Sequence, residues 1–301
     1  MTHTNWDLSI PFPRIHEGKV GESFDLPNST DLLLMLRSDR LSTENVVHET
    51  EIPRKGEYIT ALSLFWLNTV LSDMDTHIVA YGNDIGNYLD LDGMPKGIQR
   101  RAFVVKKLSI TPVEFVWRAA MTGSLWKSYQ KGEDPHRLNL PAGMHKFEEF
   151  SDWLFTPTRK SKNDPPLLSE RTALRFPEET ALTRKVVIRM SEFLAFRGIT
   201  LIDAKFEAYG SKLGDEWGSG DCTRMAYTND FWKAQITGKD PPSLDKEPAR
   251  QIASRKWAGV AHKKPLTFSN SEVEAVEACY AGGFKAITAM TLDEFWESHN
   301  C

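Results

Sequence analysis

The feature that most constrains the fold is a predicted helix followed directly by a charged strand in the second half of the chain. Apolar residues recur at helical spacing over residues 179–197, and Gly198 stands where such a helix would end. Over residues 199–208 the pattern changes to period two, which is typical of a strand. One face of this strand is apolar, and the other holds the ionisable side chains of Asp203, Lys205 and Glu207. Three such groups on one face must meet either water or a ligand.

A second strand predicted at residues 213–217 follows a short turn at residues 210–212. An antiparallel return would bring Asp215 or Glu216 opposite Glu207. Two carboxylates at that distance repel unless a cation lies between them, and Mg²⁺ is usually held by one or two carboxylates together with substrate phosphates. The pattern therefore predicts a magnesium site, and the alternative is a solvated hairpin with a charged face.

Two further segments combine glycine with groups that suit phosphate. One has glycines at positions 218 and 220 and ends in Thr223 and Arg224, which offer a hydroxyl and a guanidinium. An ordinary glycine-rich turn is the alternative interpretation. The other joins Arg118 to Ser124 across a glycine at position 123, and there the alternative is a helix terminus capped by a serine.

Length and charge narrow the class of protein. With 301 residues, two lobes are expected. Lys and Arg number 37 against 41 Asp and Glu, so the net charge of −4 gives no basic field for a nucleic acid. The longest wholly apolar stretch, residues 32–36, is far shorter than the roughly 20 residues that cross a bilayer. Residues 1–10 lack a secretory signal pattern, and an odd number of cysteines fits reduced thiols in the cytoplasm.

Local patterns also predict the organisation of the chain. We expect a buried strand at residues 32–36, a helix starting near Thr60, and a lobe boundary after the apolar run at residues 103–105. Residues 160–169 lack periodicity and are predicted to form a surface loop. Ser269 followed by Glu272 is a capping-box signature for a helix near the end of the chain. Walker A, G-x-G-x-x-G and H-E-x-x-H patterns are absent from the sequence.

Short motifs occur in a fixed order between residues 17 and 250. They are E-G-K-V at 17–20, S-D-R-L-S at 38–42, I-P-R-K-G at 52–56, S-L-F-W at 63–66, F-T-P-T-R-K at 155–160, D-A-K-F-E at 203–207, and D-E at 215–216 leading to Arg224. Taken together they resemble the motifs of the SAICAR synthetase family, which are phosphoribosylaminoimidazole-succinocarboxamide synthases.

This resemblance implies an α+β fold with two lobes and ATP in the cleft between them. The small mixed-sheet lobe would cover residues 1–105, and the larger α+β lobe residues 106–301. It also implies an ATP- and Mg²⁺-dependent ligase that joins a carboxylated aminoimidazole ribonucleotide to aspartate in purine biosynthesis.

The resemblance further implies a role for individual residues. Contacts to the nucleotide would come from Lys19, Lys106, Lys107, Leu108 and Lys160. Lys205 would lie near the reacting carboxylate, while Glu207 and Asp215 would hold Mg²⁺. The 5′-phosphate of the ribonucleotide would be bound by Arg118, Ser124, Arg224 and Arg250.

The chain departs from the family pattern at four places. Gly21-Glu22 replaces an Arg-Asp pair, Asn45 replaces an aspartate, and the loop that carries a His-Asp pair in the family contains Pro165-Pro166. The segment before Arg224 reads G-S-G-D-C-T at 218–223 instead of T-P-D-S-S. Two alternatives follow, namely the same chemistry on an analogous heterocycle or another amine in specialised metabolism, and a catalytically dead nucleotide-binding protein. The presence of Lys205, Glu207 and Asp215 together argues against the second.

Overall fold

The computed structural model describes residues 10–299 and 301. The chain divides into two compact units. Unit 1 comprises the chain up to Phe65, His77–Leu108 and Lys246–Cys301, and unit 2 comprises Trp66–Thr76 and Ser109–Asp245. Residues 1–9, on which the prediction of no secretory signal depends, lie outside the described residues. Within the described part, none of the helices has the length and apolar character needed to cross a bilayer.

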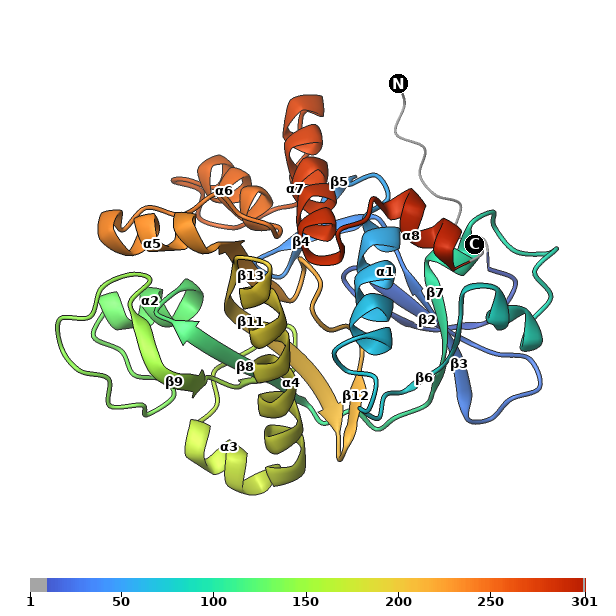
Figure 1. Cartoon of the computed structure of the whole chain (residues 1–301), viewed down its shortest axis with the longest axis horizontal. Coiled ribbons are helices and arrows are strands. Elements are labelled where there is room, and N and C mark those ends of the chain that lie inside the picture. The colour runs from blue at the N-terminus through green and yellow to red at the C-terminus, as the bar shows by residue number, and fades with distance from the viewer. Residues whose placement is uncertain (1–9, 300) are drawn as a thin grey trace. The chain divides into compact units, whose positions relative to one another are not determined.

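Unit 1 contains a five-stranded sheet in the order β1-β2-β3-β7-β6 (Figure 1). The strands are β1 (Arg14–Glu17), β2 (Gly21–Asp25), β3 (Leu32–Arg37), β6 (Ile78–Tyr81) and β7 (Ala102–Lys106). The predicted strand at residues 32–36 and the apolar run at 103–105 thus form neighbouring strands, and Leu34 and Val104 between them are fully buried. Every pairing in this sheet is antiparallel, whereas the resemblance implied a mixed sheet.

A two-stranded ribbon and a helix follow the first three strands. They are β4 (Arg40–Thr43), β5 (Val46–Glu51) and α1 (Lys55–Asn68). The helix begins before its predicted start near Thr60, because Asp39 Oδ1 accepts a hydrogen bond from the Gly56 N–H at 2.9 Å and so satisfies one donor of the first turn. A Cβ at Gly56 would lie 2.3 Å from the Arg37 carbonyl oxygen, so this close approach requires glycine.

The end of the chain also belongs to unit 1. It forms α6 (Glu247–Lys256), α7 (Asn270–Thr288) and α8 (Leu292–Ser298). Earlier in unit 1, two short 3₁₀ helices cover Gly82–Asn87 and Ile98–Arg100. The predicted capping box of Ser269 and Glu272 is confirmed at the start of α7. The prediction assigned these last residues to the second lobe. They lie in unit 1 because the ring of Phe284 of α7 packs against those of Tyr58 of α1 and Phe295 of α8, with centroid distances of 5.7 and 5.6 Å.

Unit 2 contains a six-stranded antiparallel sheet with β8 and β11 at its centre. The strands are β8 (Val113–Ala120), β9 (Glu149–Phe155), β10 (Thr158–Arg159), β11 (Ile199–Tyr209), β12 (Lys212–Gly214) and β13 (Thr223–Tyr227). The long strand β11 pairs with β8 along one edge. Along its other edge it pairs first with β13 and then with β12. The predicted charged strand is therefore confirmed, and it is the strand to which most others are attached.

Four helices complete unit 2. They are α2 (Gly123–Gln130), α3 (Ser169–Arg175), α4 (Pro177–Phe196) and α5 (Thr228–Thr237). The predicted helix at residues 179–197 corresponds to α4, which lies along the sheet over β8 and β11 (Figure 1). Its buried face includes Val186, Met190 and Leu194, and Gly198 follows it at φ +68°. Helix α4 thus covers the apolar face of β11 and leaves the charged face to other groups.

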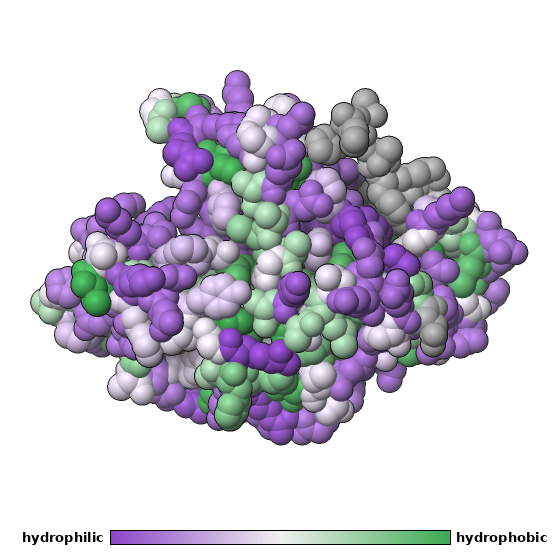
Figure 2. Space-filling view, turned by 45° about the horizontal axis from the view of Figure 1, so that its top comes forward, coloured by the Kyte–Doolittle hydropathy of each residue, from purple (hydrophilic) through white to green (hydrophobic). Residues whose placement is uncertain are grey.

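The surface is mixed. On the face drawn in Figure 2, hydrophilic residues predominate, and hydrophobic residues lie between them in small groups. Most large apolar side chains of the described residues are instead used in the cores of the two units.

Candidate active site

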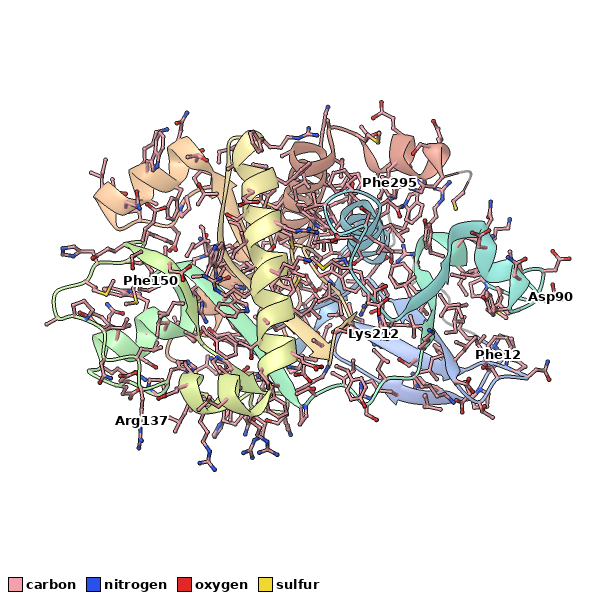
Figure 3. The ribbon with its side chains drawn as sticks, turned by 60° about the horizontal axis from the view of Figure 1, so that its bottom comes forward. Phe12, Asp90, Arg137, Phe150, Lys212 and Phe295 are labelled. Carbon is pink, nitrogen blue, oxygen red and sulfur yellow. The ribbon has the colours of Figure 1, made fainter. Side chains whose placement is uncertain are left out.

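The charged face of β11 is buried. Asp203 and Glu207 are only 4% and 3% exposed, so the alternative of a solvated hairpin is wrong. The strand returns through a hairpin whose second strand begins at Lys212 (Figure 3). Glu207 pairs in register with Gly214, and Asp215 comes next in the left-handed conformation at φ +57°. The predicted strand at residues 213–217 therefore ends at Gly214, before either carboxylate that was expected opposite Glu207.

A chain of ion pairs crosses the sheet at this point. Lys205 Nζ lies 3.1 Å from Glu114 Oε1 on β8 and 3.6 Å from Glu207 Oε1. The other oxygen of Glu207 forms an ion pair with Lys160. Thr158 of β10 donates its hydroxyl to Glu114 Oε2 at 2.6 Å. Lys205 is therefore held between two carboxylates, and Glu207 is held between two lysines.

Burial and neighbouring charges act in opposite directions on the pKa values of this cluster. Burial raises the pKa of Glu207, and the charge of Asp215 raises it further, while Lys205 and Lys160 lower it. Burial lowers the pKa of Lys205, but the surrounding carboxylates outweigh this and hold it well above its usual value. Those carboxylates belong to Glu114, Glu207, Asp215 and Glu216. Four carboxylates thus act on Lys205, and oxygen ligands of this kind suit a divalent cation.

The described residues contain no group of three or more His, Cys, Asp or Glu side chains placed to hold a metal ion. A pair of carboxylates is what Mg²⁺ needs when phosphate oxygens and water supply its other ligands. Glu207 and Asp215 fit that requirement because the charge of Asp215 acts directly on Glu207.

Two arginines meet at the other end of the charged face. Arg118 Nη1 and Arg224 Nη1 both donate to Asp203 Oδ2, at 2.5 and 2.6 Å. Arg118 also donates from Nε to Thr156 at 3.0 Å and from Nη2 to the Ser124 hydroxyl at 3.1 Å. Two guanidinium groups therefore meet at one carboxylate oxygen, and such a pair of charged donors suits a phosphate.

The start of α2 adds to this positive site. Gly123, its first residue, has φ +59°, and a Cβ there would lie 2.9 Å from Arg224 Nη1. The absence of a side chain lets the guanidinium lie against the helix N-terminus, which itself favours anions. Ser124 is not the cap that the alternative interpretation expected. Thr122 occupies the N-cap position, and Ser124 accepts a hydrogen bond from Arg118.

The glycine-rich segment before Arg224 is a buried turn rather than a phosphate cradle. A Cβ at Gly218 would lie 2.2 Å from Trp66 Nε1, and that N–H donates to the Gly218 carbonyl at 3.2 Å. The Thr223 hydroxyl donates to the Ser219 carbonyl at 2.7 Å. Only Arg224 of this segment joins the arginine pair. Burial raises the pKa of the Cys222 thiol to about 12, so it is not an activated nucleophile.

The remaining predicted site residues lie in unit 1. Lys19 is exposed in the turn between β1 and β2, where its ammonium contacts Asn45. Lys106 ends β7, and it is followed by Lys107, which forms an ion pair with Asp25 at 2.9 Å, and by Leu108. Arg250 of α6 pairs with Glu247 at 2.9 Å. The structure thus brings Arg118, Ser124 and Arg224 together in unit 2 and describes Arg250 as part of unit 1.

The loop that contains the two prolines is anchored at both ends. The Arg159 N–H donates to the Pro165 carbonyl at 2.9 Å, and the Leu167 N–H donates to the Pro157 carbonyl, also at 2.9 Å. His136 Nδ1 lies 2.8 Å from the Leu167 carbonyl oxygen, so this nitrogen carries the proton. Burial lowers the pKa of His136, which keeps the ring neutral. The predicted surface loop is confirmed up to the start of α3 at Ser169.

Sequence reasoning did not assign a role to Glu114 or His136. Glu114 has a signal in the sequence, because it lies four residues before Arg118 and period two places both on one face of β8. His136 has no such signal, since its contact is made by a segment about thirty residues away.

Comparisons with known proteins show the family of the chain. The family model described as SAICAR synthetase matches residues 14–264. The chain belongs to the SAICAR synthetase family. It is 29% identical to the phosphoribosylaminoimidazole-succinocarboxamide synthase of Schizosaccharomyces pombe over 93% of this chain and 96% of that one. It is 30% identical to the synthase of Saccharopolyspora erythraea over 95% and 97% of the two chains.

The fold is shared with solved structures of the family. The structure described as SAICAR-synthase from Saccharomyces cerevisiae complexed with SAICAR superposes with a TM-score of 0.78 at 26% identity. It covers 96% of this chain and 98% of its own. The α+β family fold is thereby confirmed, and the chain is an ATP-dependent ligase of the SAICAR synthetase type.

Proposed function

We propose that this chain joins a carboxylated aminoimidazole ribonucleotide to aspartate with the use of ATP and Mg²⁺. The observation that carries the proposal is the pair of oppositely charged sites on one face of β11. The arginine pair at Asp203 is positive, and the carboxylate cluster at Glu207 is negative. Asp203 and Glu207 are four positions apart along the strand, which is about 13 Å. A substrate with a phosphate at one end and a carboxylate to be activated at the other suits this arrangement.

Glu207 and Asp215 are proposed to hold Mg²⁺ in the negative site. The ion would supply charge stabilisation for the transferring phosphoryl group. Lys205 is proposed to bind the reacting carboxylate, and Glu114 fixes the position of its ammonium at 3.1 Å. Arg118, Ser124 and Arg224 bind the 5′-phosphate of the ribonucleotide, and Arg250 is proposed as a further arginine for the same group.

The nucleotide contacts are assigned to Lys19, Lys106, Lys107, Leu108 and Lys160. In the proposed reaction a carboxylate oxygen of the ribonucleotide attacks the γ-phosphorus of ATP, and ADP leaves. The amine of aspartate then attacks the acyl carbon, and inorganic phosphate leaves as the amide forms. Positioning and charge stabilisation account for most of the catalysis in such phosphoryl transfers.

The other hypotheses have less support. The relatives named above are called phosphoribosylaminoimidazole-succinocarboxamide synthases, which does not favour an analogous heterocycle or another amine. A catalytically dead protein is disfavoured because Lys205 and Glu207 remain organised by ion pairs. A cytoplasmic location is also proposed, from the odd number of cysteines.

The test is the Asp215→Asn variant in an ADP-release assay with the ribonucleotide, aspartate and Mg²⁺. We expect kcat to fall by about 100-fold or more, because a charged ligand is removed from the transferring phosphoryl group. Asp75→Asn is the matched control, since Asp75 is a carboxylate paired with Lys212 on the same hairpin. Unchanged melting temperatures would show that both variants fold. Wild-type turnover in Asp215→Asn would refute the metal assignment.

A further inference from the structure

The turn between β1 and β2 is held from one side through its carbonyl groups. The Gly18 N–H donates to the Gly21 carbonyl at 2.8 Å and closes the turn. Arg40 Nη2 donates to the carbonyl oxygens of Gly18 at 3.1 Å and of Gly21 at 3.4 Å. The N–H and the hydroxyl of Ser38 donate to the Val20 carbonyl at 3.0 and 2.9 Å. Three of the four carbonyls from residues 18 to 21 are therefore tied to residues 38 and 40.

Arg40 is itself fixed by a buried carboxylate. Its Nη1 lies 2.7 Å from Glu22 Oε1, and the side chain is 17% exposed. The other oxygen of Glu22 accepts a hydrogen bond from Arg14 at 3.0 Å, but the Arg14 side chain is 48% exposed. Both arginines neutralise Glu22. Of the two, Arg40 is the one that also donates to the carbonyls of the turn.

This arrangement has an electrostatic consequence. Carbonyl oxygens are the negative ends of peptide dipoles, and here a guanidinium and a serine satisfy them. Lys19 in the same turn is exposed, and its ammonium contacts Asn45 of the β4–β5 turn. Three of the four carbonyls of this turn are occupied, and its one charged side chain is a lysine. The turn is therefore suited to bind an anion.

We propose that Arg40 is a positioning residue that fixes the turn of residues 18–21 and thereby places Lys19 against the phosphates of the nucleotide. The inference rests on the proposed assignment of Lys19 to the nucleotide. Arg40 acts through the backbone of the turn and does not itself contact the ligand.

The test compares Arg40→Gln with Arg14→Gln. Each variant leaves Glu22 paired with one arginine, so the buried carboxylate stays neutralised in both. Hydrogen exchange of the peptide covering residues 17–22 reports on the turn without any ligand. Titration with ADP and Mg²⁺, without ribonucleotide, reports on nucleotide affinity, and steady-state kinetics give KM for each substrate.

We expect Arg40→Gln to speed exchange in this peptide and to weaken ADP binding about tenfold, because bonds from a charged donor are lost. KM for ATP should rise in parallel, while KM for the ribonucleotide changes less than about twofold. Arg14→Gln should behave as wild type in all three measurements. Equal effects of the two variants would overturn the proposal, because neutralisation of Glu22 would then be the cause. No effect of Arg40→Gln on exchange would also overturn it.

Two more variants separate this proposal from the function on which it rests. Arg40→Lys keeps the charge beside Glu22 but loses the planar fork, so it should lie between wild type and Arg40→Gln even if the glutamine variant folds poorly. Lys19→Gln tests the nucleotide assignment directly. Faster exchange in Arg40→Gln, with ADP affinity unchanged in both Arg40→Gln and Lys19→Gln, would overturn the assignment of Lys19 to the nucleotide. Weaker ADP binding in Lys19→Gln but not in Arg40→Gln would overturn the positioning role alone.

Discussion

Each unit contains a buried pairing of arginine with aspartate, and the two pairings differ in charge balance. In unit 1, Arg101 Nη1 and Nη2 lie 2.6 and 3.1 Å from the two oxygens of Asp39, and Nη2 also lies 3.3 Å from Glu57 Oε1, so one guanidinium faces two carboxylates. In unit 2, a single oxygen of Asp203 serves both Arg118 and Arg224. All of these groups are buried or half-buried. Burial alone therefore does not separate a pairing that supports the fold from one that binds a ligand, whereas the ratio of guanidinium groups to carboxylates differs between the two.

The second unbalanced cluster of unit 2 supports the same distinction. Around Lys205, carboxylates outnumber lysines, and the excess has the opposite sign to that at Asp203. Like charges gathered in a buried site are costly, so such a cluster persists where a ligand of opposite charge binds. The pairing at Asp39 connects the residues that follow β3 to the first turn of α1 and to the residue before β7 within unit 1.

The largest expected effect comes from breaking the pairing of Arg101 with Asp39 in unit 1. Arg101→Leu leaves the Asp39 carboxylate buried without its guanidinium, and we expect the free energy of unfolding to fall by about 3–5 kcal/mol. Arg184→Gln is the control, because both side chains of its pair with Asp152 are exposed and the pair should contribute less than about 1 kcal/mol. Urea denaturation followed by circular dichroism measures both. A loss below about 1 kcal/mol in Arg101→Leu would show that this pairing is not structural.

The patterns that predicted the fold correctly are local. The spacing within residues 32–36 and 179–197, the alternation around Lys205 and the capping box at Ser269 each depend on near neighbours along the chain. The errors arise where distant residues decide the outcome. Gly218 suggested a phosphate turn, but its conformation serves Trp66, which lies 152 residues away.

The candidate site follows the same rule. Lys205 and Glu207 could be recognised because one strand carries both. Glu114, the partner of Lys205, comes from β8, 91 residues earlier than Lys205, and the contact exists only once β8 pairs with β11. The start of α1 and the return of α7 to unit 1 likewise depend on Asp39 and Tyr58, which no local pattern could connect to them.

The next prediction concerns a neutral polar side chain of unit 1, His48. His48 Nδ1 accepts a hydrogen bond from the Leu266 N–H at 3.3 Å, and Nε2 lies 2.8 Å from the Thr43 hydroxyl. Burial, with a smaller contribution from the charge of Lys256, lowers the pKa of His48 to about 4. Between about pH 6.5 and pH 4 the unfolded chain therefore binds a proton that the native ring does not. Stability is lost as the pH falls through this range, by about 3 kcal/mol in total.

The measurement is urea unfolding at several pH values for wild type and for His48→Phe, which keeps a ring between Trp257 and Phe268. Other groups titrate over the same range, so the difference between the two proteins is the relevant quantity. The free energy of unfolding of the wild type minus that of His48→Phe should fall steadily from pH 6.5 to pH 4. Parallel curves would mean that His48 is already charged in the folded protein.

The smallest expected change in folding comes from removing one of the two guanidinium groups at Asp203. Arg224→Gln does this and keeps the contact of Asp203 with Arg118. Because Arg224 is half-buried and Asp203 stays neutralised, the free energy of unfolding should change by less than about 1 kcal/mol. KM for the ribonucleotide should nevertheless rise about 10- to 150-fold, since a charge-assisted phosphate contact of about 1.5–3 kcal/mol is lost, and KM for ATP should not change.

Arg118→Ala should also raise KM for the ribonucleotide, but at a cost in stability, because Arg118 is buried and bonded to Thr156 and Ser124 as well as to Asp203. Inorganic phosphate gives an independent measurement. It should raise the melting temperature of the wild type, where two guanidinium groups lie at Asp203, and have less effect on Arg224→Gln, where one of them is removed. If Arg224→Gln instead unfolds easily and its KM for ATP rises as much as that for the ribonucleotide, the second arginine is structural, and the arginine pair does not identify the phosphate site.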